Sequence, residues 1–191
     1  GAITWMNGQT GALTTGPLFG AVGASNSLVG STASDRIGTI SFNNRGLDSI
    51  TSYGNGNALI RSQYWNTNLS ALTWMGGLDG KLSDGSTGGV VSASNSFLGS
   101  TQFDNLGGGE NGIKVLNGNR NWVVTSPDWG GSRGAATWID SSNGHLADGT
   151  TGGVVSALNS LVGSVAFDLV GGDYACDCSG IPGGITALYN G

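Results

Sequence analysis

A nine-residue stretch occurs three times in this chain, at residues 24–32, 93–101 and 157–165. The first two copies read Ala-Ser-Asn-Ser, two large apolar residues and Gly-Ser-Thr, and the third keeps the Asn-Ser and Gly-Ser pairs. The asparagines of the three copies are separated by 95 − 26 = 69 and 159 − 95 = 64 residues. A tryptophan that follows a threonine keeps the same step, at Trp5, Trp74 and Trp138. A fixed period of this length is the signature of a repeat architecture.

The period divides the chain into three units, residues 1–69, 70–133 and 134–191. Each unit contains short apolar runs, rich in β-branched and aromatic residues, that alternate with Gly, Asn, Asp and Ser and show no helical period. Such runs fit the pleated surface of a sheet. They predict strands at the three Thr-Trp segments, residues 2–5, 71–74 and 135–138, and at the two Gly-Val-Val segments, residues 89–93 and 153–157. A further short strand is expected within each copy of the repeated stretch.

Two hairpins are predicted between these segments. The arms 49–53 and 58–62 flank Gly54-Asn55-Gly56-Asn57, and the arms 112–116 and 122–126 flank Asn117-Gly118-Asn119. Asn and Gly tolerate the positive φ that tight hairpin turns need, so Asn-Gly between two apolar runs is a strong hairpin signal.

We therefore predict an all-β chain of three tandem units, each about 64 residues long and built of four short antiparallel strands, like the blade of a propeller. A β-solenoid is the alternative fold. Closed propellers typically have about 4–8 blades, so three units are too few to close a ring. The chain is expected either to complete itself by association or to be one stretch of a longer array.

The ends of the sequence suggest how units would associate. Residues 185–191 read as the first arm of a third hairpin whose return arm is missing, and Gly1 starts directly at a Thr-Trp strand. An unpaired arm exposes backbone groups that invite pairing with another chain. We predict self-association by strand complementation, into a fibre or an oligomer, through the residues Ile185, Thr186, Ala187, Leu188, Ile3 and Trp5.

The segment from Leu116 to Trp129, with Gly134-Ala135-Ala136-Thr137-Trp138 after it, resembles tandem repeats of large secreted bacterial proteins of the haemagglutinin-like or surface-repeat type. More remotely, these segments resemble the FG-GAP blade of integrin α-chain propellers, together with Leu161-Val162-Gly163 and Asp168-Leu169-Val170-Gly171. The resemblance implies a propeller-like repeat of the cell surface. The calcium loop of the integrin type, an Asp-x-Asp-Gly-Asp run, is replaced here by uncharged Asn-Gly-Asn in both hairpins. Hard cations prefer several carboxylate ligands, so no calcium is expected there.

Composition excludes some partners and favours a location. Only 10% of the residues are charged, the net charge is −5, and the 7 Lys and Arg residues are not clustered. Nucleic acid needs a basic footprint, so we expect no nucleic-acid partner. No run approaches the roughly 18 apolar residues of a spanning helix, so no membrane insertion is expected. Low charge with abundant Ser, Thr and Asn, and no Lys or Arg after Arg133, favours an extracellular or cell-surface location.

The residues that could carry chemistry are few, and we predict no catalytic site, no cofactor and no enzyme activity. His145 is the only histidine and Glu110 the only glutamate. Asp35, Asp104 and Asp168 recur three residues before a glycine, which fits carboxylates that accept backbone N–H groups in a turn. Weak calcium binding in loops stays open for two aspartate pairs, Asp79 with Asp84 and Asp140 with Asp148. The two cysteines, Cys176 and Cys178, read either as loop thiols or as partners in a short-range or interchain disulfide.

The tryptophans divide into repeated and unrepeated positions. Trp65 and Trp129 recur, as do the three Thr-Trp tryptophans, which indicates packing between units. Trp122 aligns with Ala58, so we expect its ring to be exposed and a possible ligand contact. The leading hypothesis is a non-enzymatic extracellular structural or adhesive repeat protein, a segment of a surface fibre. The alternative is a carbohydrate-binding, propeller-like lectin module with glycans as partners on a host or neighbouring cell.

Overall fold

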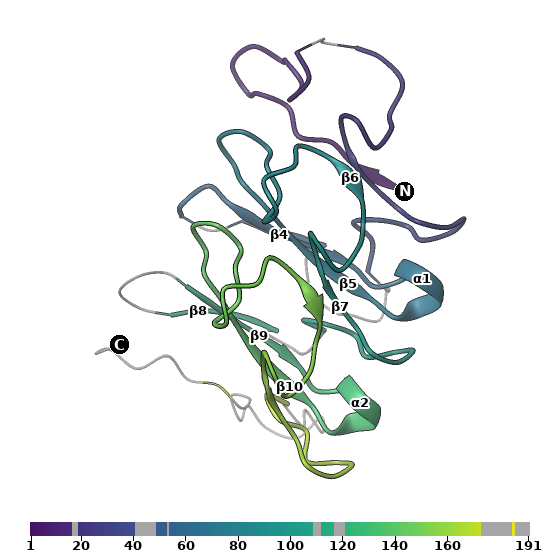
Figure 1. The fold of residues 1–191 in the computed structure, drawn as a ribbon, viewed down its shortest axis with the longest axis vertical. Coiled ribbons are helices and arrows are strands. Elements are labelled where there is room, and N and C mark those ends of the chain that lie inside the picture. The colour runs from purple at the N-terminus through teal and green to yellow at the C-terminus, as the bar shows by residue number, and fades with distance from the viewer. Residues whose placement is uncertain are drawn as a thin grey trace, which may run out of the picture.

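The computed structural model describes residues 1–16, 19–40, 49–52, 54–108, 112–116, 121–172 and 185. Within them, the chain forms short strands and two four-residue helical turns, α1 (Trp65–Asn68) and α2 (Trp129–Ser132). The strands form three sheets, which do not close into a barrel. Figure 1 shows these sheets one after another along the long axis of the molecule, in chain order. The predicted all-β fold of repeated short strands is confirmed.

Each sheet is built around one layer of antiparallel strands. The first layer pairs β1 (Ala2–Ile3) with β2 (Leu28–Val29). The middle layer contains β3 (Ile50–Ser52), β4 (Ala58–Ser62), β5 (Ala71–Met75) and β7 (Phe97–Leu98), in this spatial order. The last layer repeats that arrangement with β8 (Ile113–Val115), β9 (Trp122–Ser126), β10 (Ala135–Ile139) and β12 (Leu161–Val162).

The predicted hairpins and Thr-Trp strands are present where the chain is described. The arms around residues 54–57 form β3 and β4, and those around residues 117–119 form β8 and β9. The Thr-Trp segments form β5 and β10 in full, whereas β1 ends at Ile3. The turn residues 117–119 lie outside the described residues.

Two further strands pair with the layer that precedes their own. β6 (Gly89–Val90) follows β5 along the chain but lies parallel to β2, with Gly89 opposite Leu28. β11 (Gly153–Val154) follows β10 but lies parallel to β7, with Gly153 opposite Phe97. We call β6 and β11 donor strands, β2 and β7 acceptor strands, and each of these contacts between layers a joint. The prediction of purely antiparallel units is therefore wrong in this respect. The parallel pairs arise because a loop carries each donor strand across to the neighbouring layer.

The apolar cores lie between the layers. One cluster joins the first and middle layers and includes Leu28, Ile60 and Val91, and a second joins the middle and last layers and includes Leu59, Trp74 and Val155. Neighbouring residues of β4, Leu59 and Ile60, point into different clusters because side chains alternate along a strand. The middle layer is therefore buried on both faces, which explains why buried residues do not alternate with exposed ones along β4 and β5.

The turns α1 and α2 contain left-handed backbone rather than regular helix. Asn66, Thr67 and Asn68 have φ between 45° and 69°, and Gly130, Gly131 and Ser132 have φ between 62° and 73°. Asn and Gly are the residues that adopt this conformation most readily. Neither turn is long and apolar enough to cross a membrane, and no other helix occurs in the described part of the chain.

Trp122 is fully buried, so the expectation of an exposed ring is wrong. It lies in β9, where it pairs with Ile139 of β10 on one side and with Val115 of β8 on the other. The ring belongs to the cluster between the middle and last layers. Alignment with Ala58 misled the prediction, because two similar sheets can fill their cores with side chains of different size at matching positions. Trp122 is thus part of the core and offers no contact to a ligand.

Candidate functional site: the joints between layers

The same pair of backbone hydrogen bonds holds each joint. In the first joint, the N–H of Gly89 donates to the carbonyl of Ser27 and the N–H of Val91 to that of Val29, both at 3.0 Å. In the second joint, the N–H groups of Gly153 and Val155 donate to the carbonyls of Ser96 and Leu98, again at 3.0 Å. The two joints are therefore one structural motif used twice.

A glycine before each donor strand permits this contact. A Cβ atom on Gly88 would lie 2.8 Å from the backbone nitrogen of Ser27 and 2.9 Å from the carbonyl oxygen of Ala24. A Cβ atom on Gly152 would lie 2.7 Å from the carbonyl oxygens of both Ala93 and Ser96. Backbone atoms in a packed sheet cannot move aside as a flexible side chain can, so both joints require glycine here. This requirement accounts for the first glycine of the shared sequence Gly-Gly-Val-Val at residues 88–91 and 152–155.

The asparagine of the repeated stretch shapes the donor strand. Asn95 Nδ2 donates to the carbonyl of Val90 at 3.1 Å, and Asn95 Oδ1 accepts the N–H of Ser92 at 3.0 Å. Asn159 makes the same two bonds in the last layer, and Asn26 makes them in the first layer. The donor conformation is therefore formed by each layer itself, before any contact with a neighbour is considered.

The recurring tryptophan reaches across each joint. Trp5 Nε1 donates to the carbonyl of Gly77 at 3.0 Å, and Trp74 Nε1 donates to the carbonyl of Ser141 at 3.1 Å. Gly80 and Gly144 lie directly against the two rings, since a Cβ on either would be 2.6 Å or less from the ring Cγ. The predicted packing of these tryptophans between units is confirmed. The ring and its N–H hold one layer against the loop of the next.

The recurring aspartate caps a turn in its own layer and binds the next layer as well. Asp104 Oδ2 accepts the N–H of Thr101 at 2.8 Å, while its Oδ1 accepts the N–H of Gly130 in α2 at 2.9 Å. Asp35 makes the equivalent bonds with Thr32, at 2.8 Å, and with Asn66 of α1, at 2.9 Å. The carboxylate accepts backbone N–H groups in a turn, as predicted, but the turn precedes the aspartate, from Thr101 to Asp104, and does not run to the glycine three residues later. The bond between layers was missed because its donor is a backbone N–H, which leaves no side-chain pattern in the sequence.

These bonds make the first joint sensitive to acid. Burial of the Asp35 carboxyl opposes ionisation, but hydrogen bonds from the side chain and backbone of Thr32 and from Asn66 and Ser31 outweigh it and lower the pKa below the ordinary 3.8. A lowered pKa adds stability that is present above about pH 4 and is lost as the pH falls through the folded-state value.

We expect the urea concentration at the unfolding midpoint to decrease when the pH is lowered below 4, and to decrease less steeply in Asp35→Asn. An equal acid response in both proteins would contradict this assignment.

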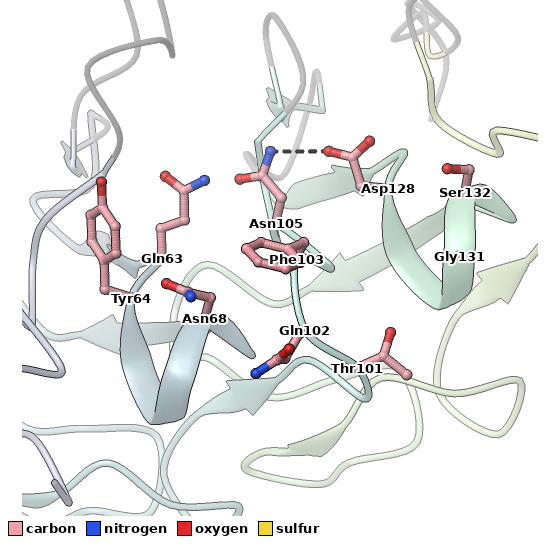
Figure 2. Close-up of a pocket in the computed structure, with 10 residues that line it drawn as sticks. All are labelled: Gln63, Tyr64, Asn68, Thr101, Gln102, Phe103, Asn105, Asp128, Gly131 and Ser132. Carbon is pink, nitrogen blue, oxygen red and sulfur yellow. Dashed lines mark hydrogen bonds between the residues drawn. The ribbon is translucent and has the colours of Figure 1, made fainter.

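A groove of about 510 Å³ lies between the middle and last layers, beside α1 and α2. Amide side chains line it, including Gln63, Asn68 and Gln102, and Asn105 Nδ2 donates to Asp128 Oδ2 across it at 3.1 Å. Figure 2 shows the Phe103 ring among these polar groups, and the side chain is 67% exposed. The Tyr64 ring makes a cation–π contact with Arg36, whose guanidinium lies 5.0 Å from the ring centroid. Phe103 is therefore the exposed aromatic ring that this groove offers.

The structure places some of the predicted association residues inside the chain's own contacts. Ile3 pairs with Leu28 in the first layer, and Trp5 is half-buried at the first joint. Ile185 is half-buried, whereas Thr186, Ala187 and Leu188 lie outside the described residues, as do Cys176 and Cys178. The predicted pairing through the arm 185–191 therefore stays a prediction.

The other residues considered for chemistry lie in loops and joints. His145 Nε2 donates to the carbonyl of Ser83 at 3.2 Å, which places the ring at the second joint. The loop aspartates bind their own turns: Asp79 Oδ1 accepts the N–H of Lys81, and Asp140 Oδ1 accepts that of Ser142. In the described ranges, no group of three or more His, Cys, Asp or Glu residues is placed to hold a metal ion.

Comparison with known families gives the same division into layers. The family described as "Repeat of unknown function (DUF5650)" matches residues 1–39, 52–108 and 116–172. The chain belongs to this repeat family. Each matched segment contains the donor segment and the central strands of one layer, whereas β8 and all but the last residue of β3 lie outside the matches. No curated protein and no solved structure matched the chain.

The last DUF5650 repeat presents an acceptor side that no described residue covers. Leu161 of β12 is 75% exposed, whereas the equivalent residues Leu28 and Phe97 are 0% and 2% exposed. Trp138 is half-buried, as Trp5 is, whereas Trp74 is 5% exposed, and no hydrogen bond to a described residue beyond its layer is present at the Trp138 ring. Asp168 is exposed, and the hydrogen bonds that it accepts from described residues all go to Oδ2. The groups that hold the two joints are thus present a third time, and no neighbouring layer covers them among the described residues.

Proposed function

We propose that this chain is a non-enzymatic structural and adhesive repeat protein of the cell surface, a segment of a fibre built by β-strand addition. The observation that carries the proposal is the joint, in which the same strand pair, glycine, tryptophan and aspartate contacts join successive repeats twice. A joint that repeats without change can extend a stack in one direction, which is what a structural array needs.

Two features of the sequence support an extracellular place for this array. Only 10% of the residues are charged, and the chain contains no Lys or Arg after Arg133. The segment from Leu116 to Trp138 resembles repeats of secreted bacterial haemagglutinin-like proteins, and the proposal takes up that resemblance.

Immunogold electron microscopy of cells that produce the chain tests this function. Antibodies raised against the purified chain should label filaments or the outer surface of intact cells. Labelling confined to the interior of sectioned cells would overturn the extracellular structural role.

The groove beside Phe103 favours a second candidate function, carbohydrate binding. Sugars present hydroxyl groups for amides and an apolar face for an aromatic ring, and the groove combines Gln63, Asn68 and Asn105 with an exposed Phe103. This candidate replaces Trp122 as the expected ligand contact. It fits the adhesive part of the proposal, because a glycan is a common cell-surface ligand.

An immobilised oligosaccharide array provides the test of the second candidate. We expect saturable binding by the unmodified chain and a loss of affinity of about tenfold or more in Phe103→Ala, equivalent to roughly 1.4 kcal/mol. Phe167→Ala is the matched control, since Phe167 is 73% exposed at the equivalent position of the last layer, where no following layer is described. The same affinity in both variants, or no binding by the unmodified chain, would contradict a glycan role for the groove.

A further inference from the structure

We infer that the acceptor side of the last layer is a docking site for a further DUF5650 repeat with a Gly-Gly-Val-Val donor strand, and that Phe19 prevents the first layer of a second copy from occupying it. This inference concerns how the stack is extended, and it holds whether or not the stack lies on the cell surface.

The acceptor side is identified by its continuity with the two joints. At each joint, the acceptor layer contributes the edge of a two-residue strand, a tryptophan N–H and an aspartate Oδ1. In the last layer the same positions are Leu161–Val162, Trp138 and Asp168. Exposed strand edges recruit another strand, and a large exposed leucine on that edge adds apolar area to be buried.

The occupant is specified by what the acceptor tolerates. A Cβ atom at the position before the donor strand would lie within 2.9 Å of acceptor backbone atoms in both joints, so only glycine fits there. The second valine of each Gly-Gly-Val-Val segment is buried, with Val91 at 2% and Val155 at 4% exposure. A partner must therefore supply Gly-Gly followed by a residue of any size and then a buried apolar residue, as the middle and last layers do.

The first layer has the donor conformation but the wrong residue. Gly20 has a φ of 148°, close to 141° at Gly89 and 128° at Gly153, and Asn26 holds Ala21 as its equivalents hold Val90 and Val154. Val22 occupies the position of Val91 and is 64% exposed. The constant offset of 69 residues, for example 89 − 20 and 95 − 26, places Phe19 where Gly88 stands.

A phenylalanine at this position cannot enter the joint. Its Cβ alone would collide with acceptor backbone, and its ring would separate the two strands. The donor strands of the middle and last layers already fill joints within the chain. An unmodified second copy thus has no free Gly-Gly-Val-Val strand among its described residues to offer.

A single substitution tests this inference by creating an association. The full chain carrying Phe19→Gly should form head-to-tail oligomers that grow with concentration, measured by light scattering after size exclusion and seen as short filaments by electron microscopy. The unmodified chain should remain unassociated through this face. Circular dichroism establishes that both proteins have the same fold.

A charge on the acceptor edge provides the control. Adding Leu161→Lys to Phe19→Gly should weaken association by about tenfold or more, because an edge lysine blocks strand addition. Adding Leu78→Lys instead should change nothing, since Leu78 is 91% exposed on a loop of the middle layer. A folded Phe19→Gly chain that stays monomeric, or oligomers indifferent to Leu161→Lys, would overturn the docking site. Association of the unmodified chain that Leu161→Lys abolishes would show that a second copy is the occupant and overturn the role of Phe19.

Discussion

Trp122→Ala should lower the free energy of unfolding by about 3–5 kcal/mol, the usual cost of removing a buried tryptophan from a core. Trp122 is fully buried in the central strand β9, and its ring packs in the cluster shared by the middle and last layers. The cavity would therefore weaken two layers at once. Urea unfolding followed by circular dichroism measures the change.

Trp138→Ala is the matched control for this prediction. Trp138 lies on the neighbouring strand β10 and is only half-buried. We expect its loss to destabilise the chain by less than half as much as Trp122→Ala. Equal effects of the two substitutions would mean that Trp122 does not have the central place in the core described here.

Gly152→Phe should disconnect the last layer from the middle layer, at a cost of about 3–6 kcal/mol. The side chain cannot fit against the carbonyl oxygens of Ala93 and Ser96, so the second joint has to open. Opening exposes Phe97 and Val155, and each buried side chain of this size contributes about 1.5–3 kcal/mol. We expect thermal unfolding to begin at a lower temperature and to split into separate steps, recorded by calorimetry.

Gly8→Phe separates this effect from the general cost of placing phenylalanine in a loop. A Cβ on Gly8 would meet no atom within 4 Å, and the residue is exposed. Its substitution should leave the melting curve almost unchanged. A Gly152→Phe chain that melts like the unmodified one would contradict the glycine requirement of the joint.

Much of the fold could be predicted from the sequence because local signals determine it. The hairpin β3–β4 follows from Asn-Gly between apolar runs, and the aspartate turns follow from an Asp close in sequence to the N–H groups that it accepts. These structures form within about fifteen residues of chain. Their partners are therefore close in sequence and visible in the pattern.

The joints could not be predicted in the same way, because each pairs two residues with a strand about 60 residues away. Gly153–Val154 has no local feature that indicates parallel pairing with Phe97–Leu98, and a strand of two residues carries little register information. The contact between Asp104 and Gly130 is likewise to a backbone N–H. The repeated Gly-Gly-Val-Val pattern was the available signal in the sequence. Its first glycine indicates a close backbone contact only when the position of the neighbouring layer is known.

The burial of Trp122 shows a second limit of reasoning from repeats. The comparison of Trp122 with Ala58 assumes that equivalent positions in two repeats have the same surroundings. The hairpin of the last layer, however, packs against a different set of neighbours from those of the middle layer. Repeats conserve the backbone contacts of the joint more closely than they conserve side-chain volume in the core.

Amide hydrogen exchange, resolved by residue with NMR spectroscopy, tests the central claim that parallel strand pairs join the repeats. We expect protection of the N–H groups of Gly89, Val91, Gly153 and Val155, which donate to the preceding layer. Gly20 and Val22 are the internal reference, because no described residue accepts their N–H groups. We expect the donor-strand amides to exchange at least about 100-fold more slowly than those of Gly20 and Val22. Equal exchange at all three donor segments would mean that the joints do not exist in solution.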